Sequence, residues 1–348
     1  MKNYVNSPLK QIIISDPTLR DGNHAVQHQL TLQDIKHYAQ AIDEVGIDIV
    51  EVGHGNGLGA SSIQLGKSAY SDLEILQTAR AALKHTKLGV HIIPGFARTN
   101  KELALALDQG VDTFRIAAHC TEADLTARHI EFISKAGREV FGVLMMTHMA
   151  SATTLLQEAT KMQNYGAQAI ILMDSAGAYL PTDVTEKVSL LQMNLQIPIG
   201  FHAHNNLGMA IANSLAAVSA GATILDATAC GFGAGAGNAA LEVLVAVLQK
   251  LQYGLSIDLP KLLIAIDVAR QSFIKQVPFI TTHSLLSGLH GVFSGFAKPV
   301  QKAATDFNVD AHEIFRLLGE RNVVAGQEDL IIEVAKELQS VHGTAPTI

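Results

Sequence analysis

Short apolar runs alternate with stretches of helical period along the first 250 residues of the chain. The apolar, β-branched runs predict strands, and the stretches between them repeat their apolar positions every three to four residues, as amphipathic helices do. The predicted strands are 12–15, 47–52, 88–93, 113–117, 140–145, 169–173, 197–201 and 223–227. The predicted helices between them include 31–45, 72–83, 123–136, 153–165, 182–193 and 207–219. This alternation is typical of an α/β protein with a parallel sheet.

Four times a helix-like stretch ends on a glycine and a predicted strand follows at once. These glycines are Gly46, Gly110, Gly166 and Gly221. The residue just past a helix end often adopts a left-handed conformation that glycine tolerates best, so the four positions mark αβ turns. Eight strands, each followed by a helix, predict a (β/α)8 TIM barrel. An open, doubly wound parallel sheet is the alternative with the same alternation.

From residue 258 onward the pattern changes to helices only. Apolar periodicity predicts helices over 261–276, 311–318 and 329–338. We therefore expect a TIM-barrel catalytic domain over residues 1–257 and a C-terminal helical domain over residues 258–348.

Composition narrows the class of protein further. Of the 348 residues, 48% are hydrophobic and 16% are charged, against about 25% charged in average soluble proteins, which excludes a disordered chain. The net charge of −7 argues against a nucleic-acid partner. Two cysteines, Cys120 and Cys230, are too few for a disulfide framework or a thiolate zinc site. The apolar runs are too short to span a membrane and the N-terminus has no signal-peptide core, so we expect a cytoplasmic protein.

Histidines and carboxylates follow the predicted strands, at the end of the barrel where catalytic groups lie in this fold. His202 and His204 are two apart at a strand end, so both imidazoles face the same side. Asp21 follows the first strand, which a closed barrel brings near the seventh. Two histidines and one carboxylate suit a divalent metal, Mn or Mg, with Zn, Co or Fe as further candidates. A helix-capping or arginine-paired carboxylate is the structural alternative for Asp21.

Two other patterns bear on the chemistry. No lysine falls at the end of a predicted strand, which disfavours a Schiff-base aldolase and favours a metal-stabilised enolate. A glycine-rich run at 230–238 follows the eighth strand and leads into a helix. Its backbone N–H groups suit an anionic substrate at a helix N-terminus, and Asn238 is a candidate additional ligand or ligand support.

Several of these segments together resemble the 4-hydroxy-2-oxovalerate aldolase family. They are Ser-Asp-Pro-Thr-Leu-Arg-Asp-Gly-Asn-His-Ala at 15–25, Leu-Met-Met-Thr-His-Met at 144–149, Gly-Phe-His-Ala-His-Asn-Asn-Leu at 200–207 and Gly-Ala-Gly-Ala-Gly-Asn at 233–238. The family belongs to a wider group of barrels that includes hydroxymethylglutaryl-CoA lyase and isopropylmalate synthase. The resemblance implies a class II, divalent-metal aldolase, usually manganese-dependent. Such an enzyme splits 4-hydroxy-2-oxopentanoate into pyruvate and acetaldehyde late in the breakdown of aromatic compounds.

The resemblance also implies roles for individual residues and for a partner. It places Asp21, His202 and His204 on the metal, Arg20 on the enolate oxygen and His24 as the base. It places Ser175, with Arg20, Asp21 and His202, in contact with the 2-oxo acid substrate. The family typically pairs with an acylating acetaldehyde dehydrogenase, and the C-terminal helical part helps to form that complex and covers the substrate. An oligomer is therefore expected.

One departure from the family pattern concerns the C-terminal part. The family has a tyrosine in a Gly-Val-Tyr-Ser segment that reaches over the substrate, and this chain has Phe293 there. Phe293 keeps the ring as a substrate contact but cannot make the hydroxyl hydrogen bond, so the aldehyde choice and the stereochemistry at C4 are left open. His290 is a candidate replacement for the polar group, or a surface residue.

Three other functions stay open on the sequence alone. An acyl-CoA/2-oxo acid condensing synthase uses the same barrel and would release CoA. A non-haem iron oxygenase uses a two-histidine, one-carboxylate set. A non-catalytic partner subunit of a dehydrogenase is the third, because the family tyrosine is missing.

Overall fold

The computed structural model describes residues 11–324 and 326–343 and shows a closed barrel of eight parallel strands in chain order. The strands are β1 (Ile13–Leu19), β2 (Ile49–Val52), β3 (Lys87–Ile92), β4 (Thr113–His119), β5 (Glu139–Met145), β6 (Ala169–Asp174), β7 (Ile199–Ala203) and β8 (Ile224–Asp226). Because β1 pairs with β8 as well as with β2, the sheet has no open edge. The predicted TIM barrel is confirmed and the open sheet is excluded. The N-terminal segment used in the signal-peptide argument, residues 1–10, lies outside the described residues.

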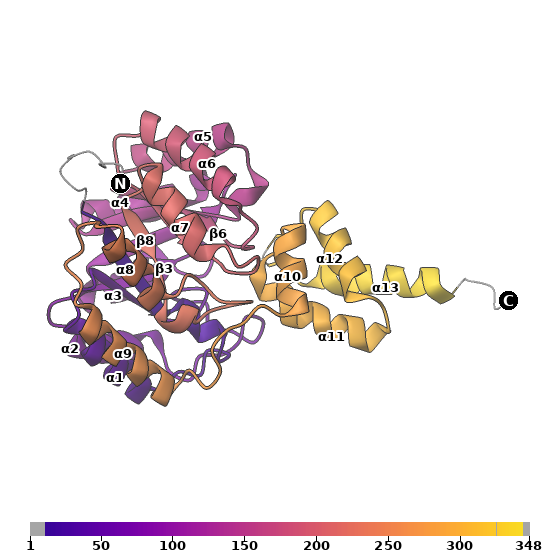
Figure 1. The fold of residues 1–348 in the computed structure, drawn as a ribbon, viewed down its shortest axis with the longest axis horizontal. Coiled ribbons are helices and arrows are strands. Elements are labelled where there is room, and N and C mark those ends of the chain that lie inside the picture. Colours follow the sequence, from indigo (N-terminus) through magenta and orange to yellow (C-terminus); the bar gives the residue numbers. More distant parts are fainter. Residues whose placement is uncertain (1–10, 325, 344–348) are drawn as a thin grey trace.

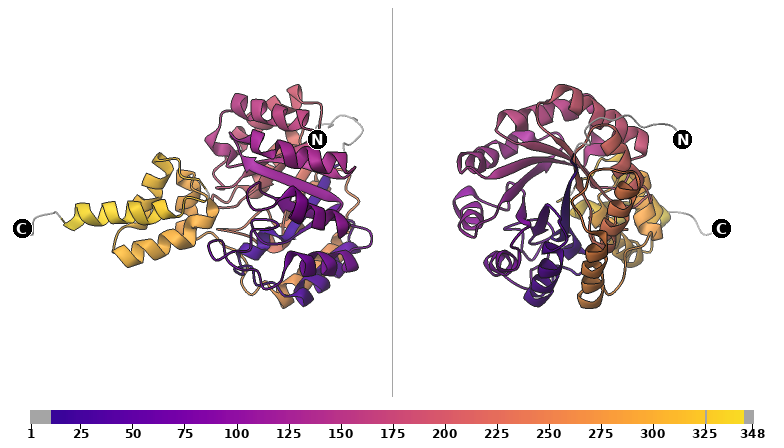
Figure 2. Two further views of the ribbon diagram at one scale, coloured as in Figure 1. Left: turned by 180° about the vertical axis from the view of Figure 1, so that it is seen from behind. Right: turned by 60° about the vertical axis from the view of Figure 1, so that its left-hand side comes forward.

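One helix follows each strand and covers the outside of the barrel (Figures 1 and 2). These helices are α1 (Leu32–Asp43), α2 (Asp72–Ala82), α3 (Ala104–Asp108), α4 (Ala127–Lys135), α5 (Ala152–Asn164), α6 (Pro181–Asn194), α7 (Ala210–Ser219) and α8 (Leu241–Lys250). Their buried faces form one apolar core with the outward-facing strand residues. Among the described residues, none of the helices has the length and apolar character needed to cross a membrane.

Strand β1 is longer than its sequence pattern predicted, because polar residues continue it. It runs to Leu19, four residues past the predicted end, and Asp16 and Thr18 in this stretch are buried. Asp16 accepts hydrogen bonds from the Thr18 backbone N–H at 2.9 Å and from the Tyr38 hydroxyl at 2.6 Å. These bonds satisfy the buried carboxyl group. The extension carries the chain to Arg20 and Asp21 at the end of the barrel where the other strands also end.

Five helices follow the barrel: α9 (Leu259–Ser272), α10 (Thr282–His290), α11 (Ala297–Phe307), α12 (Ala311–Glu320) and α13 (Asp329–Gly343). The buried face of α9 belongs to the barrel core, although α9 lies beyond residue 257. Helices α10–α13 have an apolar core of their own and form a narrow lobe that projects from the barrel (Figure 1). We call α10–α13 the lobe. The division of the chain into domains at residue 257 stays a prediction.

The sequence pattern did not predict α10 and α11. Gly288 lies inside α10 and Pro299 lies in the first turn of α11, and both residues weaken a helical pattern read from one sequence. Proline is tolerated in a first turn because its missing N–H has no intrahelical partner there. Packing in the lobe core outweighs these local preferences.

The lobe is attached at the C-terminal ends of the strands. The Ser294 hydroxyl donates to the carbonyl of Ser175, after β6, at 2.8 Å, and Asn206 Nδ2, after β7, donates to the Ser294 hydroxyl at 2.8 Å. After β5, the His148 ring bonds the carbonyl of Gly291 at 2.7 Å through Nε2. The lobe therefore lies beside the end of the barrel at which the predicted site residues gather.

Candidate metal centre and active site

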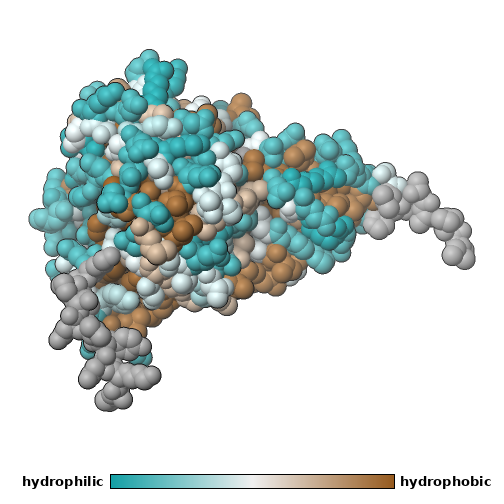
Figure 3. Space-filling model, turned by 90° about the horizontal axis from the view of Figure 1, so that it is seen from above, coloured by the Kyte–Doolittle hydropathy of each residue, from teal (hydrophilic) through white to brown (hydrophobic). Residues whose placement is uncertain are grey.

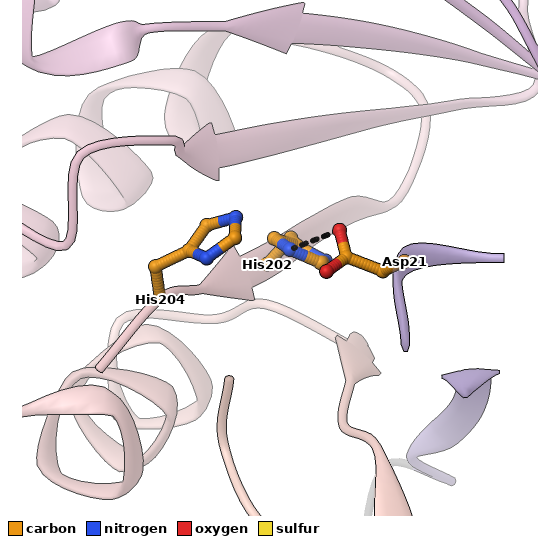
Figure 4. A group of neighbouring side chains, drawn as sticks. All are labelled: Asp21, His202 and His204. Atoms are coloured by element: carbon orange, nitrogen blue, oxygen red, sulfur yellow. Dashed lines mark ion pairs between the residues drawn. The ribbon is translucent and has the colours of Figure 1, made fainter. Parts of the chain in front are cut away.

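The structure brings Asp21, His202 and His204 together at the end of the barrel (Figure 4). All three are buried, and one ligand atom from each lies within 4.8 Å of the others. His202 lies in β7 and His204 directly after it, so their side chains share a face. Asp21 opens a 3₁₀ turn after β1, and both β1 and β7 pair with β8. The expected proximity of the three residues is therefore present.

One ring nitrogen of each histidine has no hydrogen-bond partner and is available as a metal ligand. His202 Nδ1 lies 2.9 Å from Asp226 Oδ2, while His202 Nε2 has no hydrogen-bond partner, and neither has His204 Nδ1. A metal-binding histidine commonly bonds a carboxylate through its other ring nitrogen, which fixes the tautomer and the ring orientation. Buried imidazole nitrogens without partners are rare unless another group occupies them. The three residues thus fit a divalent metal.

Asp21 is held by neighbours that leave it ionised. Its Oδ1 accepts a hydrogen bond from Asn238 Nδ2 at 3.0 Å and its Oδ2 accepts one from Arg20 Nη1 at 2.9 Å. Burial opposes ionisation, but the Arg20 guanidinium and the nearby imidazoles outweigh it and hold the pKa of Asp21 well below its usual range. Burial also lowers the pKa of His204 to about 3. An anionic carboxylate and a neutral imidazole are the states that bind metals.

Arg20 is buried beside this centre and has one nitrogen to spare. Its Nε donates to Glu51, its Nη1 donates to Asp21 and to the carbonyl of Gly55, and its side chain is only 4% exposed. Nη2 has no partner among the described residues. A buried guanidinium nitrogen without a partner is available for a substrate oxygen.

A cavity of about 420 Å³ lies where the end of the barrel meets the lobe. Its wall includes His24 from the loop after β1, Gly233 from the loop after β8, and Ser294 from the lobe. A Cβ atom on Gly233 would lie 2.6 Å from Asp21 Oδ1, so the wall reaches the candidate metal ligand. The cavity therefore lies beside the three-residue centre, separated from Asp21 by the backbone at Gly233.

His24 lies in this wall as a neutral imidazole. Its ring packs on Gly55, where a Cβ atom would come within 2.6 Å of ring atoms. Burial lowers the pKa of His24 and the Arg20 charge acts in the same direction, while Asp21 opposes them. A neutral imidazole that faces a cavity is able to accept a proton.

Two family models match most of the chain. The HMGL-like model matches residues 11–268, and the DmpG-like communication domain matches residues 278–340. Proteins named 4-hydroxy-2-oxovalerate aldolase from Pectobacterium atrosepticum and Spirochaeta aurantia are each 56% identical to this chain. The matches cover 94% and 96% of this chain, and 96% and 98% of the relatives' own lengths. The chain belongs to the 4-hydroxy-2-oxovalerate aldolase family.

Solved structures agree with this family assignment in their fold. The N-terminal domain of a candidate aldolase from Bacteroides vulgatus is 26% identical, with a TM-score of 0.72, and the match covers 85% of this chain and 98% of that domain. The carboxyl transferase domain of Rhizobium etli pyruvate carboxylase is 16% identical, with a TM-score of 0.79 over 96% of this chain and 61% of that one. At 16% identity, the second likeness shows a shared fold and nothing further.

The structure does not bring all the residues expected from the family to the cavity. The Ser175 hydroxyl accepts a hydrogen bond from the Met146 backbone N–H at 3.0 Å, and Ser175 is buried beneath Ser294. Phe293 packs edge-on against Phe296 in the lobe, with ring centroids 5.7 Å apart, and is not among the residues that line the cavity. Substrate contact by Ser175 and Phe293 stays a prediction.

Other histidines that follow strands make structural contacts instead. His54 is fully buried and stacks on His28 with 3.6 Å between ring centroids, and His148 bonds the lobe. His290, considered as a replacement for the family tyrosine's hydroxyl, lies beside His312 in the lobe, with 5.1 Å between ring centroids. Of the histidines at the strand ends, His24, His202 and His204 are those that reach the centre or its cavity.

Sequence reasoning missed several polar residues inside the barrel. Asp226 holds His202, and Arg115 on β4 pairs with Asp226 and with Glu51. His91 on β3 is the Cα partner of Arg115, is buried, and has an Nδ1 without a hydrogen-bond partner. A charged or imidazole side chain within an otherwise apolar strand was the available signal, since such groups are seldom buried without a specific partner.

Proposed function

We propose that this chain is a divalent-metal-dependent aldolase that cleaves 4-hydroxy-2-oxopentanoate, or a related 4-hydroxy-2-oxo acid, to pyruvate and an aldehyde such as acetaldehyde. The observation that carries the proposal is the convergence of Asp21, His202 and His204 beside the unpartnered Nη2 of Arg20. Relatives of that name are 56% identical over nearly the whole chain. The cavity lining includes Lys275 and Lys298, and its described residues include no carboxylate. This charge suits an anionic substrate.

In the proposed reaction, the protein's own residues bind the 2-oxo acid and move the proton. Asp21, His202 and His204 would hold a divalent metal, which would supply Lewis-acid polarisation of the 2-oxo acid. Arg20 Nη2 donates to the oxygen on which negative charge develops, and electrostatic stabilisation of this kind is usually the largest catalytic effect. His24 takes the proton of the C4 hydroxyl. The C3–C4 bond then breaks, the aldehyde leaves, and the electron pair stays on the pyruvate enolate, which takes up a proton at C3.

Manganese is the metal that we propose, with magnesium, cobalt and zinc as the alternatives. The two imidazole nitrogens and one carboxylate form a mixed nitrogen and oxygen donor set that suits several divalent ions. Reconstitution of metal-free protein with each ion separately, followed by the cleavage rate at equal occupancy, identifies the ion that supports turnover.

The decisive experiment is exchange of the pyruvate methyl protons in heavy water, with and without Mn²⁺. Metal-dependent exchange is expected, because the enolate forms at C3 whichever aldehyde is used. Absence of exchange in metal-loaded protein would overturn the proposal. A parallel assay for CoA release from acetyl-CoA and a 2-oxo acid distinguishes a condensing synthase on the same barrel.

We also propose that the lobe contacts an acylating acetaldehyde dehydrogenase. The DmpG-like communication domain covers residues 278–340, which include all of α10, α11 and α12. Apolar side chains are exposed along this part, among them Phe279, Ile280 and Leu289, and Figure 3 shows apolar areas on the lobe as well as on the barrel. Co-purification of the two proteins, and its loss with charged substitutions at Leu289 and Phe279, tests the assignment. A cytoplasmic location remains part of the proposal.

A further inference from the structure

A fully buried arginine lies inside the barrel behind the proposed metal centre. Arg115 comes from the middle of β4 and its side chain is 1% exposed. It does not line the cavity, and the mechanism above gives it no part. Burial of a guanidinium group in a barrel interior is costly unless its charge is compensated, so its partners reveal its role.

Arg115 bridges two buried carboxylates that come from β8 and β2, the two strands that pair with β1. Its Nη2 donates a hydrogen bond to Asp226 Oδ2 on β8 at 2.5 Å. Its Nε forms an ion pair with Glu51 Oε2 on β2 at 3.3 Å, without a hydrogen bond. Its Nη1 also donates to the Ser15 hydroxyl on β1, at 3.4 Å. Both carboxylate side chains are at most 1% exposed. One guanidinium group thus links β4 to three other strands.

Each of the two carboxylates has a second partner in the active centre. Glu51 accepts the Nε–H of Arg20 through its other oxygen, Oε1. Asp226 Oδ2 lies 2.9 Å from Nδ1 of His202. A continuous chain therefore runs from Arg20 through Glu51, Arg115 and Asp226 to His202. Its two ends are the residue proposed to hold the enolate oxygen and a proposed metal ligand.

We propose that Arg115 is a positioning residue. It fixes the side chains of His202 and Arg20 relative to each other and does not touch the substrate. The inference rests on the metal site of the proposed function. The planar guanidinium presents several donors in a rigid fork and is able to hold two carboxylates at once, whereas the ammonium group of lysine is a single point charge. A lysine at this position keeps the charge but pairs with only one of the two carboxylates, Asp226 or Glu51.

The test compares Arg115→Lys with wild type and with Arg80→Lys as the matched control. Arg80 pairs with Asp112 at 2.8 Å on the partly exposed outer side of the barrel. Folding is checked by circular dichroism and thermal unfolding, the Mn²⁺ dissociation constant by calorimetry, and kcat and KM by pyruvate exchange. We expect R115K to bind Mn²⁺ about 10- to 100-fold more weakly, the usual cost of losing a residue that orients a ligand. We also expect it to lose kcat, and R80K to stay within twofold of wild type.

The outcomes separate the two proposals. Wild-type protein that binds no Mn²⁺ overturns the metal site and this inference with it. Wild-type binding together with a folded R115K of unchanged Mn²⁺ affinity and kcat overturns the role of Arg115 alone. A purely structural role would lower the unfolding temperature and leave the affinity of the folded variant unchanged. If R115K does not fold, a crystal structure of the wild type with Mn²⁺ decides: a bound ion on His202 with the Arg115–Asp226 contact broken overturns the inference.

Discussion

The protonation states of a few buried side chains decide what the proposed centre is able to do. Asp21 stays ionised because the Arg20 guanidinium outweighs the effect of burial on its pKa. His204 and His24 stay neutral because burial lowers the pKa of both. The same protein interior therefore favours the anion at one residue and the neutral form at the others, according to the charge that lies beside each. This pattern matches a metal ligand set with a base at the cavity wall.

Substitution of His24 by alanine distinguishes a role as general base from a role as metal ligand. We expect Mn²⁺ to remain bound and the cleavage rate to fall by about 10²–10⁴-fold, the usual contribution of a general base. Mn²⁺ affinity and kcat are to be measured on the same preparation, with His37→Ala, at an exposed position of α1, as the control. Loss of the metal in H24A would assign His24 to the ligand set instead.

Phe293 is the residue at which the aldehyde specificity of this chain is to be examined. Phe293→Tyr introduces the hydroxyl group that the family resemblance predicts at this position, and one new hydrogen bond is worth about 0.5–1.5 kcal/mol. We therefore expect the ratio of kcat/KM values for two aldehydes, or the ratio of the two C4 stereoisomers, to change by roughly two- to tenfold. Competition between the two aldehydes measures the first ratio, and chiral analysis of the aldol products measures the second. An unchanged product profile would mean that the ring stays packed on Phe296 and does not reach the substrate.

At the scale of elements, the loop after β8 packs against the proposed metal ligands. Asn238, at the end of its glycine-rich run, bonds Asp21 and also the carbonyl of Phe232 at 3.3 Å. Asn206, after β7, accepts the N–H of Ala236 in the same loop and donates to Ser294 in the lobe. The loop is thus held between the metal ligands and the lobe, and its glycines keep it close to both.

Gly233→Ala tests this close approach. Its added methyl group would lie 2.3 Å from Asn238 Nδ2 and 2.6 Å from Asp21 Oδ1, so one of these side chains has to move. We expect at least a tenfold loss of Mn²⁺ affinity, measured by calorimetry, with the barrel still folded. Gly137→Ala is the control, because a Cβ atom there meets nothing within 4 Å, although its positive φ costs some stability. Equal affinity in G233A and wild type would show that the loop yields without disturbing Asp21.

At the scale of the whole molecule, buried histidines link stability to pH. Burial lowers the pKa of both His54 and His148 to about 4, from an ordinary value near 6.5. Between these values the unfolded chain binds more protons than the folded one, so the free energy of unfolding falls as pH decreases from about 6.5 to 4 and is flat above 7 with respect to these groups. Urea unfolding of metal-free protein at pH 7.5, 6 and 5 measures the slope. We expect a smaller slope for His148→Gln, and a slope equal to that of wild type would contradict the assignment.

Removal of the metal should abolish turnover and leave the fold intact. Extensive apolar cores stabilise the barrel and the lobe, so we expect the chain to fold without the metal. We expect chelation to stop pyruvate exchange without changing the circular dichroism spectrum. Mn²⁺ at 100 times its dissociation constant should then raise the free energy of unfolding by about 2.7 kcal/mol. Asp21→Asn is the control that should lose most of this increase, and unfolding on chelation would contradict the expectation.

Much of the fold and part of the site were predictable from local patterns. The eight strands follow from apolar runs, and the pair His202 and His204 follows from a spacing of two at a strand end. The extension of β1 to Leu19 was missed because polar residues that are buried by specific hydrogen bonds look like loop residues in a sequence. Helices α10 and α11 were missed because a glycine and a proline interrupt short apolar patterns.

The sequence by itself determined the order of the strands, the barrel and the three candidate ligands, because periodicity and spacing are properties of neighbouring residues. Only the tertiary structure decided what holds those ligands. Asp226, Arg115 and Glu51 lie on three different strands, up to 175 residues apart, and meet only when the barrel closes. It also decided that Phe293 packs in the lobe and Asn206 joins the lobe to the barrel. Side-chain contacts across such distances depend on strand register and packing, which no local pattern encodes.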